Sequence, residues 1–335
     1  MKIVWWLPAL LLGVLTSCNL ADGGYATEPG TREYTWSVDT LYSPPGGWVY
    51  NMWGSSPNDV WAVVNTGMTT LWHYNGEEWS GYPERVAPAL YSIYGFARDD
   101  VWAGSFDGKI YHYDGQQWQQ SHRYSKEGYY IRGVTDIRGS SPSDVYAVGT
   151  AQKVDGGYVG FILHNDGTGW REVLITEFEI QFNRVRVDAE AVIIHATKAG
   201  LDGNTLFRLI DGNLDELVSV NYSEGRLGMN ELGETTYFMI KHSLYRFMSD
   251  RLVPVMTFSD QDVIIFDGRH EQDIFLHTSS GVMHYDGDSM EYLLTVPEDM
   301  NRNVFRSVFF ENEVFFYVPY YDQGTNLIYH GTLNE

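Results

Sequence analysis

The chain has 335 residues, of which 44% are hydrophobic, and it is rich in aromatic side chains, with 11 Trp, 24 Tyr and 16 Phe. Aromatic residues favour β-strands, where their rings pack on a pleated surface, and the apolar fraction is sufficient for a core. The formal net charge of −22 repels a phosphate backbone, which argues against nucleic acid as a partner.

The first residues have the layout of a signal peptide. "MKIVWWLPALLLGVLTSC" begins with Lys2, continues with an apolar stretch and ends in small polar residues. The apolar stretch, Ile3 to Leu15, is shorter than the roughly 20 residues that a transmembrane helix requires, so a permanent membrane span is the weaker interpretation. We therefore expect residues 1–17 to be a signal peptide that is removed.

The only cysteine of the chain, Cys18, closes the sequence "LTSC". This sequence resembles the bacterial lipobox, and the resemblance implies that Cys18 carries acyl chains such as palmitate and attaches the protein to a membrane. More than one chain is needed, because a single acyl chain binds a membrane only marginally. Residues 18–31 are polar and Gly-rich, which is typical of a flexible tether. Asn19 is not the Asp that resembles an inner-membrane retention signal in enteric bacteria, so we expect the outer membrane of the cell envelope, on either side.

The remaining region, residues 32–335, contains an internal repeat. The clear copies are "GSSPNDVWAV" at Gly54, "GFARDDVWAG" at Gly95, "GSSPSDVYAV" at Gly139 and "GRHEQDIFLH" at Gly268. The aspartates of the first three copies are 41 and 44 residues apart, and three intervals of 43 separate the third from the fourth. Weaker copies near Glu190, Thr235 and Glu313 bring the number of repeats to seven.

Each repeat also contains a second hairpin. "WHYNGEEW", "YHYDGQQW" and "LHNDGTGW" place Asn-Gly or Asp-Gly between alternating apolar residues, which is a strong hairpin signal. Four short strands repeated every 40 to 45 residues predict an all-β fold, a seven-bladed β-propeller. The last blade provides only three strands, so we expect the segment from Arg32 to Thr40 to supply the fourth and close the ring.

The repeated residues are predicted to be structural, because an active site is one constellation rather than the same carboxylate in every blade. They are the acidic and aromatic residues of the first hairpin and the Trp that closes the second: Asp59, Trp61, Asp100, Trp102, Asp144, Tyr146, Asp273, Phe275, Trp79, Trp118 and Trp170. The histidines His73, His112, His164 and His284 lie at equivalent positions, which favours packing or hairpin hydrogen bonds. We expect no metal site, no cofactor and no catalytic residue, since none of the corresponding motifs is present.

The repeat resembles that of secreted bacterial propeller proteins with the signature Gly-Ser-x-x-Asp-Val-Trp-Ala-Val-Gly. The likeness is strong in blades 1 to 3 and 6 and faint in the others. It implies an envelope or surface scaffold.

Binding residues are expected on the face that carries the connections between blades, because variable loops on a rigid scaffold are the usual place for binding. The segment from Ser121 to Arg132, "SHRYSKEGYYIR", gathers cations and tyrosines in an acidic protein. The candidates are Trp48, Tyr82, Arg85, His122, Arg123, Tyr124, Lys126, Tyr129, Tyr130, Tyr320 and Tyr321. The alternative is a solvated loop whose tyrosines cover neighbouring blades.

Three functions remain open. The first is a monomeric, lipid-anchored, non-catalytic propeller that binds or scaffolds a protein or carbohydrate partner. The second is a carbohydrate-active hydrolase or lyase with its site in the propeller funnel, where Glu84, Glu127, Asp155 and Asp322 lie on the proper face. The third is a subunit of an envelope assembly machine that makes contact through its blade edges.

Overall fold

The computed structural model describes residues 33–42, 47–64, 70–82, 86–87, 89–187, 191–198, 203–248, 251–258, 263–296, 306–320 and 325–334. These residues form 28 strands and no helix. Within these ranges there is accordingly no apolar helix of the length needed to cross a membrane. The predicted signal peptide and tether lie outside the described residues. The all-β class expected from the sequence is confirmed.

The strands form antiparallel four-stranded sheets that follow one another along the chain. One eight-stranded sheet divides into two such units, which are joined by the parallel pair Leu232 and Gly268. We number the four-stranded units as sheets 1 to 7. Sheet 1 consists of β2 (Val49–Ser56), β3 (Asp59–Val64), β4 (Leu71–Tyr74) and β5 (Trp79–Gly81). Sheet 2 consists of β6 (Leu90–Ala97), β7 (Asp100–Ser105), β8 (Lys109–Tyr113) and β9 (Trp118–Arg123). Sheet 3 consists of β10 (Tyr129–Ser141), β11 (Asp144–Lys153), β12 (Tyr158–Asn165) and β13 (Trp170–Ile175).

The later sheets follow the same order. Sheets 4 to 7 consist of β14 (Ile180–Val187), β15 (Val192–Lys198), β16 (Gly203–Ile210) and β17 (Asn213–Asn221); β18 (Leu227–Leu232), β19 (Thr235–Ile240), β20 (Ser243–Met248) and β21 (Arg251–Thr257); β22 (Val263–His270), β23 (Asp273–Thr278), β24 (Gly281–Tyr285) and β25 (Met290–Thr295); and β26 (Ser307–Phe309), β27 (Glu313–Tyr320) and β28 (Thr325–Leu333) with β1 (Tyr34–Tyr42).

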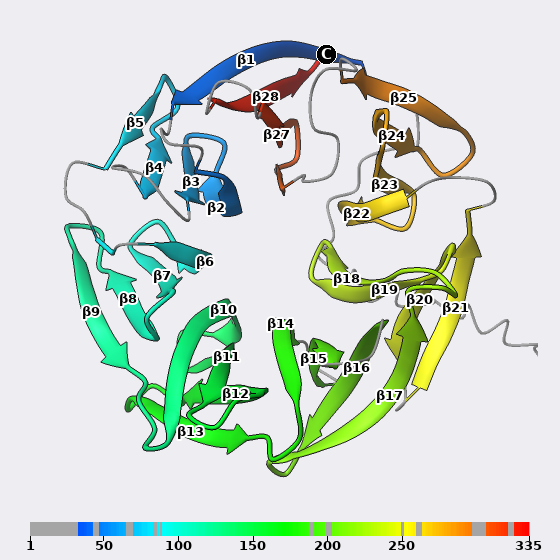
Figure 1. Cartoon of the computed structure of the whole chain (residues 1–335). Coiled ribbons are helices and arrows are strands. Elements are labelled where there is room, and N and C mark those ends of the chain that lie inside the picture. Colours follow the sequence, from blue (N-terminus) through cyan, green and yellow to red (C-terminus); the bar gives the residue numbers. More distant parts are fainter. Residues whose placement is uncertain are drawn as a thin grey trace, which may run out of the picture.

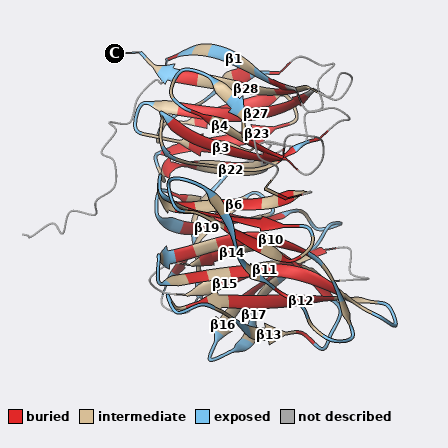
Figure 2. Ribbon diagram, turned by 90° about the vertical axis from the view of Figure 1, so that its left-hand side faces the viewer, coloured by how far each residue is buried: buried red, intermediate tan, exposed pale blue. Residues whose placement is uncertain are grey.

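The sheets are arranged in a circle, with the first strand of a sheet, such as β6 or β22, towards the centre and the fourth, such as β9 or β25, at the rim (Figure 1). Buried apolar clusters lie between neighbouring sheets. Trp61 of sheet 1 belongs to one cluster with Ile93 of sheet 2, and Val60 of sheet 1 belongs to another with Phe315 of sheet 7. Buried residues run along strands such as β11 and β12 (Figure 2). The core is therefore divided among the spaces between sheets.

The glycine of each clear repeat copy lies at a β-bulge in the first strand of its sheet. A Cβ atom on Gly95 would lie 2.6 Å from the ring of Trp53 in the preceding sheet and 2.8 Å from the carbonyl oxygen of Asp100. Gly54 and Gly139 are approached in the same way by a phenylalanine ring at 2.8 Å. In all four clear copies the carbonyl oxygen of the repeat aspartate would lie within 2.8 Å of an added Cβ, and in the first three an aromatic ring of the neighbouring sheet adds to the crowding, so the position requires glycine.

In sheets 1, 2, 3 and 6 the second hairpin turns at the Asn-Gly or Asp-Gly pair that the sequence indicated. In sheet 2, the carboxylate of Asp114 accepts hydrogen bonds of 2.9 Å from the amides of Gln116 and Gln117, and these bonds lower its pKa. Gly115 has a φ of 86°, a left-handed conformation that glycine adopts without strain.

The N-terminal strand β1 pairs along its whole length with β28, from Tyr34 opposite Leu333 to Tyr42 opposite Thr325. The ring of Trp36 packs on Gly331, where an added Cβ would lie 2.7 Å from the indole. Sheet 7 therefore combines three strands from the end of the chain with one from its beginning, which is the pairing that the missing fourth strand predicted.

Candidate functional site

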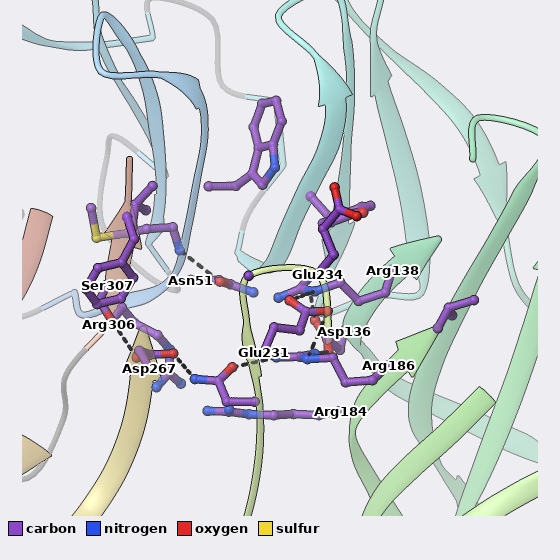
Figure 3. Close-up of a pocket in the computed structure, with 18 of the residues that line it drawn as sticks. Asn51, Asp136, Arg138, Arg184, Arg186, Glu231, Glu234, Asp267, Arg306 and Ser307 are labelled. Carbon is purple, nitrogen blue, oxygen red and sulfur yellow. Dashed lines mark hydrogen bonds and ion pairs between the residues drawn. The ribbon is translucent and has the colours of Figure 1, made fainter. Parts of the chain in front are cut away.

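The first strands of the sheets enclose a central cavity of about 1520 Å³. Each of the seven sheets contributes a side chain from its first strand to the lining: Asn51, Tyr94, Asp136, Arg184, Glu231, Asp267 and Ser307. Charged residues that share this wall come from strands far apart in the sequence (Figure 3).

Asp136 and Glu231 form a network with two arginines on one side of the central cavity (Figure 3). The carboxylate of Asp136 contacts Arg138 at 3.0 Å and Arg186 at 2.9 Å. Glu231 contacts the Nε atom of Arg186 at 3.3 Å and that of Arg138 at 3.9 Å. Burial disfavours the charge on Arg186, but Glu231 and Asp136 overcome this effect and raise its pKa. The two carboxylates and two guanidiniums therefore neutralise one another.

Asp267, Arg184 and Arg306 form a second group. The carboxylate of Asp267 accepts hydrogen bonds from Asn230 and from the hydroxyl of Ser307. Burial raises the pKa of Asp267 to about 6, although Ser307 and the charge of Arg184 act in the opposite direction. Burial, followed by the positive charge of Arg306, lowers the pKa of Arg184 to about 9, which leaves it charged at pH 7.

The arginines of this second group are held by backbone carbonyls. Arg184 donates to the carbonyl of Met229 at 3.1 Å, and Arg306 donates from Nε to the carbonyl of Tyr50 at 2.6 Å. Among the described residues, no carboxylate oxygen lies within 4.0 Å of the Arg184 guanidinium. This part of the wall carries two cations and one carboxylate that is readily protonated.

A second, smaller cavity has a volume of about 690 Å³. It is lined by Phe106, Asp107 and residues of the segment from Arg123 to Arg132, and we call it the 106–132 groove. Tyr130 at 60% and Phe106 at 43% are among the most exposed large apolar side chains described. Arg123, Lys126 and Arg132 add positive charge to the lining. The groove thus combines exposed rings with cations in a protein of net charge −22.

The groove is lined by five of the eleven predicted ligand-face residues, but the predicted bounds of the connection between sheets 2 and 3 are wrong. His122 and Arg123 belong to the outer strand β9, and Tyr129 and Tyr130 begin β10, so the connection between the sheets is only 124–128. Tyr124 lines the groove but is only 5% exposed, and its ring packs at 4.5 Å on Phe161. Its hydroxyl and Lys126 both bond to Glu172, at 2.7 and 2.6 Å, which fixes this connection on sheet 3.

Of the other predicted ligand-face residues, Trp48 and Tyr82 do not line the groove. Trp48 is 40% exposed next to β2, and Tyr82 packs at 6.0 Å from Trp61 in the core between sheets 1 and 2. Arg85 and Tyr321 lie outside the described residues, and so does the side chain of Tyr320 at the end of β27. Of the carboxylates predicted for a funnel site, Glu127 lines the groove and Asp155 lines neither cavity, whereas Glu84 and Asp322 lie outside the described residues.

The repeated residues lie within and between the sheets. In sheet 1, Asp59 accepts a hydrogen bond of 2.7 Å from His73, whose ring stacks at 4.0 Å on Trp61. The same acid and histidine pair recurs at 2.7 to 2.8 Å in sheets 2, 3 and 6, as Asp100 with His112, Asp144 with His164 and Asp273 with His284. In sheet 7 the pair is Glu313 and His330, stacked on Phe315.

The aromatic members link neighbouring sheets. Trp61 approaches Trp118 at 5.7 Å, Trp102 approaches Trp170 at 5.5 Å, and Phe275 approaches Phe309 at 4.7 Å. Trp79 lies 6.5 Å from Phe315, and Tyr146 packs against the core between sheets 3 and 4.

The charged residues of the central cavity were missed by the sequence prediction. One signal was available: the residue directly before the repeat glycine faces the cavity in all four clear copies. These residues are Trp53, Tyr94, Arg138 and Asp267. The type of side chain at this position differs from copy to copy, so a search for repeated residues does not detect it.

Groups of three or more histidine, cysteine or acidic residues that could hold a metal ion do not occur in the described part of the chain. The chemistry available in the two cavities is therefore that of arginine, carboxylate and aromatic side chains, which suits charge recognition and stacking.

No family model and no curated protein matches the chain by sequence. Solved structures do match. The structure described as YCF48 bound to D1 peptide is 14% identical, with a TM-score of 0.59 and coverage of 90% of this chain and 99% of that one. YCF48 from Cyanidioschyzon merolae is 12% identical, with a TM-score of 0.57 over 88% of this chain and 98% of that one.

Two further matches come from other kinds of protein. The β-propeller domain of Cps50 (Swd1) from Myceliophteria thermophila is 10% identical, with a TM-score of 0.55 and coverage of 87% and 99%. The extracellular domain of a putative hybrid two-component system of B. thetaiotaomicron is 14% identical, with a TM-score of 0.54 over 89% of this chain and 39% of that one. At such identities the likeness concerns the fold alone. The chain has a β-propeller fold.

Proposed function

We propose that this protein is a lipid-anchored β-propeller of the bacterial cell envelope that binds a protein partner and is not itself a catalyst. The propeller is a ring of seven four-stranded blades closed by β1. Support for the ring comes from the apolar clusters on both sides of sheet 7, one shared with sheet 6 and one with sheet 1. Support for a protein partner comes from YCF48, a propeller whose structure is described with a bound peptide.

The observation that carries the proposal is the 106–132 groove. Tyr130 and Phe106 are exposed although aromatic rings favour burial, and exposed rings of this kind are frequent anchors in protein interfaces. The connection beneath them is fixed by the bonds of Tyr124 and Lys126 to Glu172, so the rings need little further ordering on binding. Arg123 and Arg132 favour an acidic segment as the partner.

The test is recovery of a partner from detergent-solubilised envelope by the full chain. We expect the natural chain to recover a protein partner. The amount recovered should fall at least tenfold when Phe106→Ala is combined with Tyr130→Ala, since each ring contributes about 1–2 kcal/mol to such an interface. The matched control is Tyr292→Ala, which removes a 49% exposed ring from the outer strand β25 of sheet 6. Equal recovery with the groove variant, or no partner at all, contradicts the proposal.

A second candidate, a carbohydrate-active hydrolase or lyase in the central cavity, draws on the raised pKa of Asp267, since a general acid requires a carboxyl group that stays protonated. Against it, Asp136 and Glu231 are both engaged by arginines. Asp267→Asn separates the two candidates: it abolishes hydrolysis by an enzyme and leaves recovery of a groove partner unchanged.

A further inference from the structure

Phe178 is an exposed ring at the same end of the sheets as the 106–132 groove. It lies in the connection between β13 and β14, is 49% exposed, and has the exposed residues Glu177 and Glu179 beside it in the sequence. Thr176 fixes this connection, because its hydroxyl accepts a hydrogen bond of 3.1 Å from the amide of Gly160 and donates one of 2.9 Å to the carbonyl of Phe178. We call residues 177–179 the acidic segment.

The turn between β11 and β12 joins the groove to the acidic segment. On one side, the amide of Val154 donates a hydrogen bond of 3.0 Å to the carbonyl of Gly128, in the connection that lines the groove. On the other side, the ammonium of Lys153 donates a bond of 3.1 Å to the carbonyl of Glu177. Val154 itself is 64% exposed. Groove, turn and acidic segment therefore form one continuous surface, with exposed apolar side chains at both ends and in the middle.

The groove end of this surface is positive once its ion pairs are counted. Lys126 contacts Glu172 at 2.6 Å, and Asp107 contacts Lys109 at 2.6 Å. The charged side chains that remain in the lining are Arg123, Arg132 and Glu127. Within the described part of the chain, none of these three forms an ion pair within 4.0 Å. Two cations therefore face one carboxylate.

The other end of the surface is negative. Neither Glu177 nor Glu179 has an ion pair within 4.0 Å among the residues that the structure describes. Lys153 bonds to the backbone carbonyl of Glu177 and not to its carboxylate. A ring between two unpaired carboxylates is the chemical complement of a groove that combines exposed rings with unpaired arginines.

We propose that the 106–132 groove of one copy receives the acidic segment of a second copy, so that the protein forms a homodimer rather than the monomer expected from the sequence. The inference rests on the proposed function, in which the groove binds a protein, and it names that protein. In a two-fold dimer both copies use the same surface, so each groove meets the acidic segment of the other copy. Phe178 then packs against Phe106 and Tyr130, and the two acids approach the two arginines.

The two-fold axis passes near the turn between β11 and β12, because this turn lies between the two contacts. The Val154 side chains of the two copies therefore face each other, and both lose their exposure to water. Asp155, in the same turn, approaches its own copy as well, but at an exposed position salt screens this repulsion.

Sedimentation equilibrium of the purified full chain in detergent, over about 1–100 µM, tests the dimer. We expect the dissociation constant to rise at least tenfold in Phe178→Ala, because each dimer loses two buried rings. The matched control, Tyr292→Ala, removes a 49% exposed ring from the outer strand β25 and should leave the constant unchanged within twofold. All samples keep Cys18, so any pairing of acyl chains within a micelle is common to them.

Charge reversal provides a test that a folding defect cannot imitate. One variant combines Arg123→Glu with Arg132→Glu, and the other combines Glu177→Arg with Glu179→Arg. Each variant alone brings like charges together at both contacts, so we expect it to be monomeric. The two variants should pair when they are mixed, because a reversed groove meets a reversed segment at one contact and a natural groove meets a natural segment at the other.

A cysteine at the turn tests the position of the axis. Cys18 is the only natural cysteine of the chain and is expected to be acylated. Mild oxidation should therefore link two chains of Val154→Cys through a disulfide and leave Tyr292→Cys unlinked. Val154→Cys that stays unlinked contradicts the two-fold arrangement.

The homodimer and the proposed function can fail separately. A purified chain that stays monomeric, a dimer that Phe178→Ala leaves intact, or charge variants that do not pair when mixed overturn the homodimer. A different envelope protein that only the intact groove recovers also overturns it, and at the same time supports the proposed function. If the homodimer is correct, a tagged chain recovers the untagged natural chain from the envelope, and the groove variant does not.

Discussion

At the scale of single residues, the repeat encodes a hydrogen-bonded pair of an acid and a histidine, and the histidine stacks on an aromatic ring. The acid begins the second strand of a sheet, the aromatic residue lies two positions after the acid, and the histidine lies opposite that aromatic residue on the third strand. In three sheets the residue after the repeat glycine also donates to the acid: Ser55 and Ser140 do so in sheets 1 and 3, and Arg269 does so in sheet 6. The repeated carboxylate therefore has a structural role.

Sheet 6 gives the sharpest prediction for this pair. Asp273 is fully buried and accepts bonds from His284 at 2.7 Å and Arg269 at 2.8 Å. In Asp273→Ala the buried guanidinium of Arg269 loses its carboxylate, and we expect the free energy of unfolding to fall by about 3–5 kcal/mol. Asp100→Ala is the matched control: among the residues that the structure describes, its side chain bonds to His112 alone, and it is 23% exposed, so a loss of about 1 kcal/mol is expected. Similar losses in denaturant titrations of the two variants would show that burial of the arginine is not the cause.

At the scale of elements, β1 is the strand that completes sheet 7. It pairs with β28 over nine residues, buries Leu41 completely, and places Trp36 on Gly331. It also supplies Tyr34, whose hydroxyl accepts a bond of 3.2 Å from Arg269 in sheet 6. The strand therefore joins sheet 7 to its neighbour as well as completing it.

Deletion of residues 32–40 should lower the free energy of unfolding by several kcal/mol, because strand pairing, the burial of Trp36 and the constraint on the ring are lost together. Deletion of residues 19–31, the predicted tether, should change it little. Thermal unfolding of the two deletions compares them directly. Equal melting temperatures would mean that β1 contributes nothing to closure.

Elements built from the repeat could be predicted from the sequence, and the others could not. Residues that are close in the sequence and recur specify these elements. Examples are the bulge glycines, the turn at Asp114 and Gly115, and the pair of Asp59 and His73. The outer strand β9 was mistaken in part for a loop because it is polar: its residues face solvent, so the strand lacks an apolar pattern. The wall of the central cavity escaped prediction because most of its charges come from β10, β14, β18 and β22, which belong to different sheets and are far apart in the sequence.

At the scale of the whole molecule, the two ends of the strands have different roles. Tyr34, where β1 begins, contacts Arg269 at the end of the sheets that carries the repeat turns. Phe106 and the start of β10 lie at the opposite end, where the connections between sheets gather. The first described strand, β1, therefore begins at the end of the sheets opposite to the 106–132 groove.

The acyl chains on Cys18 are the only strong membrane attachment that this protein is expected to have, because a net charge of −22 is repelled by an anionic lipid surface. Cys18→Ser should therefore move the protein from the membrane to the soluble fraction, or leave it with its signal peptide uncleaved, while the melting temperature of the propeller stays the same. Asn19→Ser, one residue further along the tether, keeps the acylated cysteine and should fractionate as the natural chain does. Fractionation followed by immunoblotting measures both. If Cys18→Ser remains with the membrane at the natural level in processed form, the anchor is not the lipid, and the attachment must lie on the propeller itself.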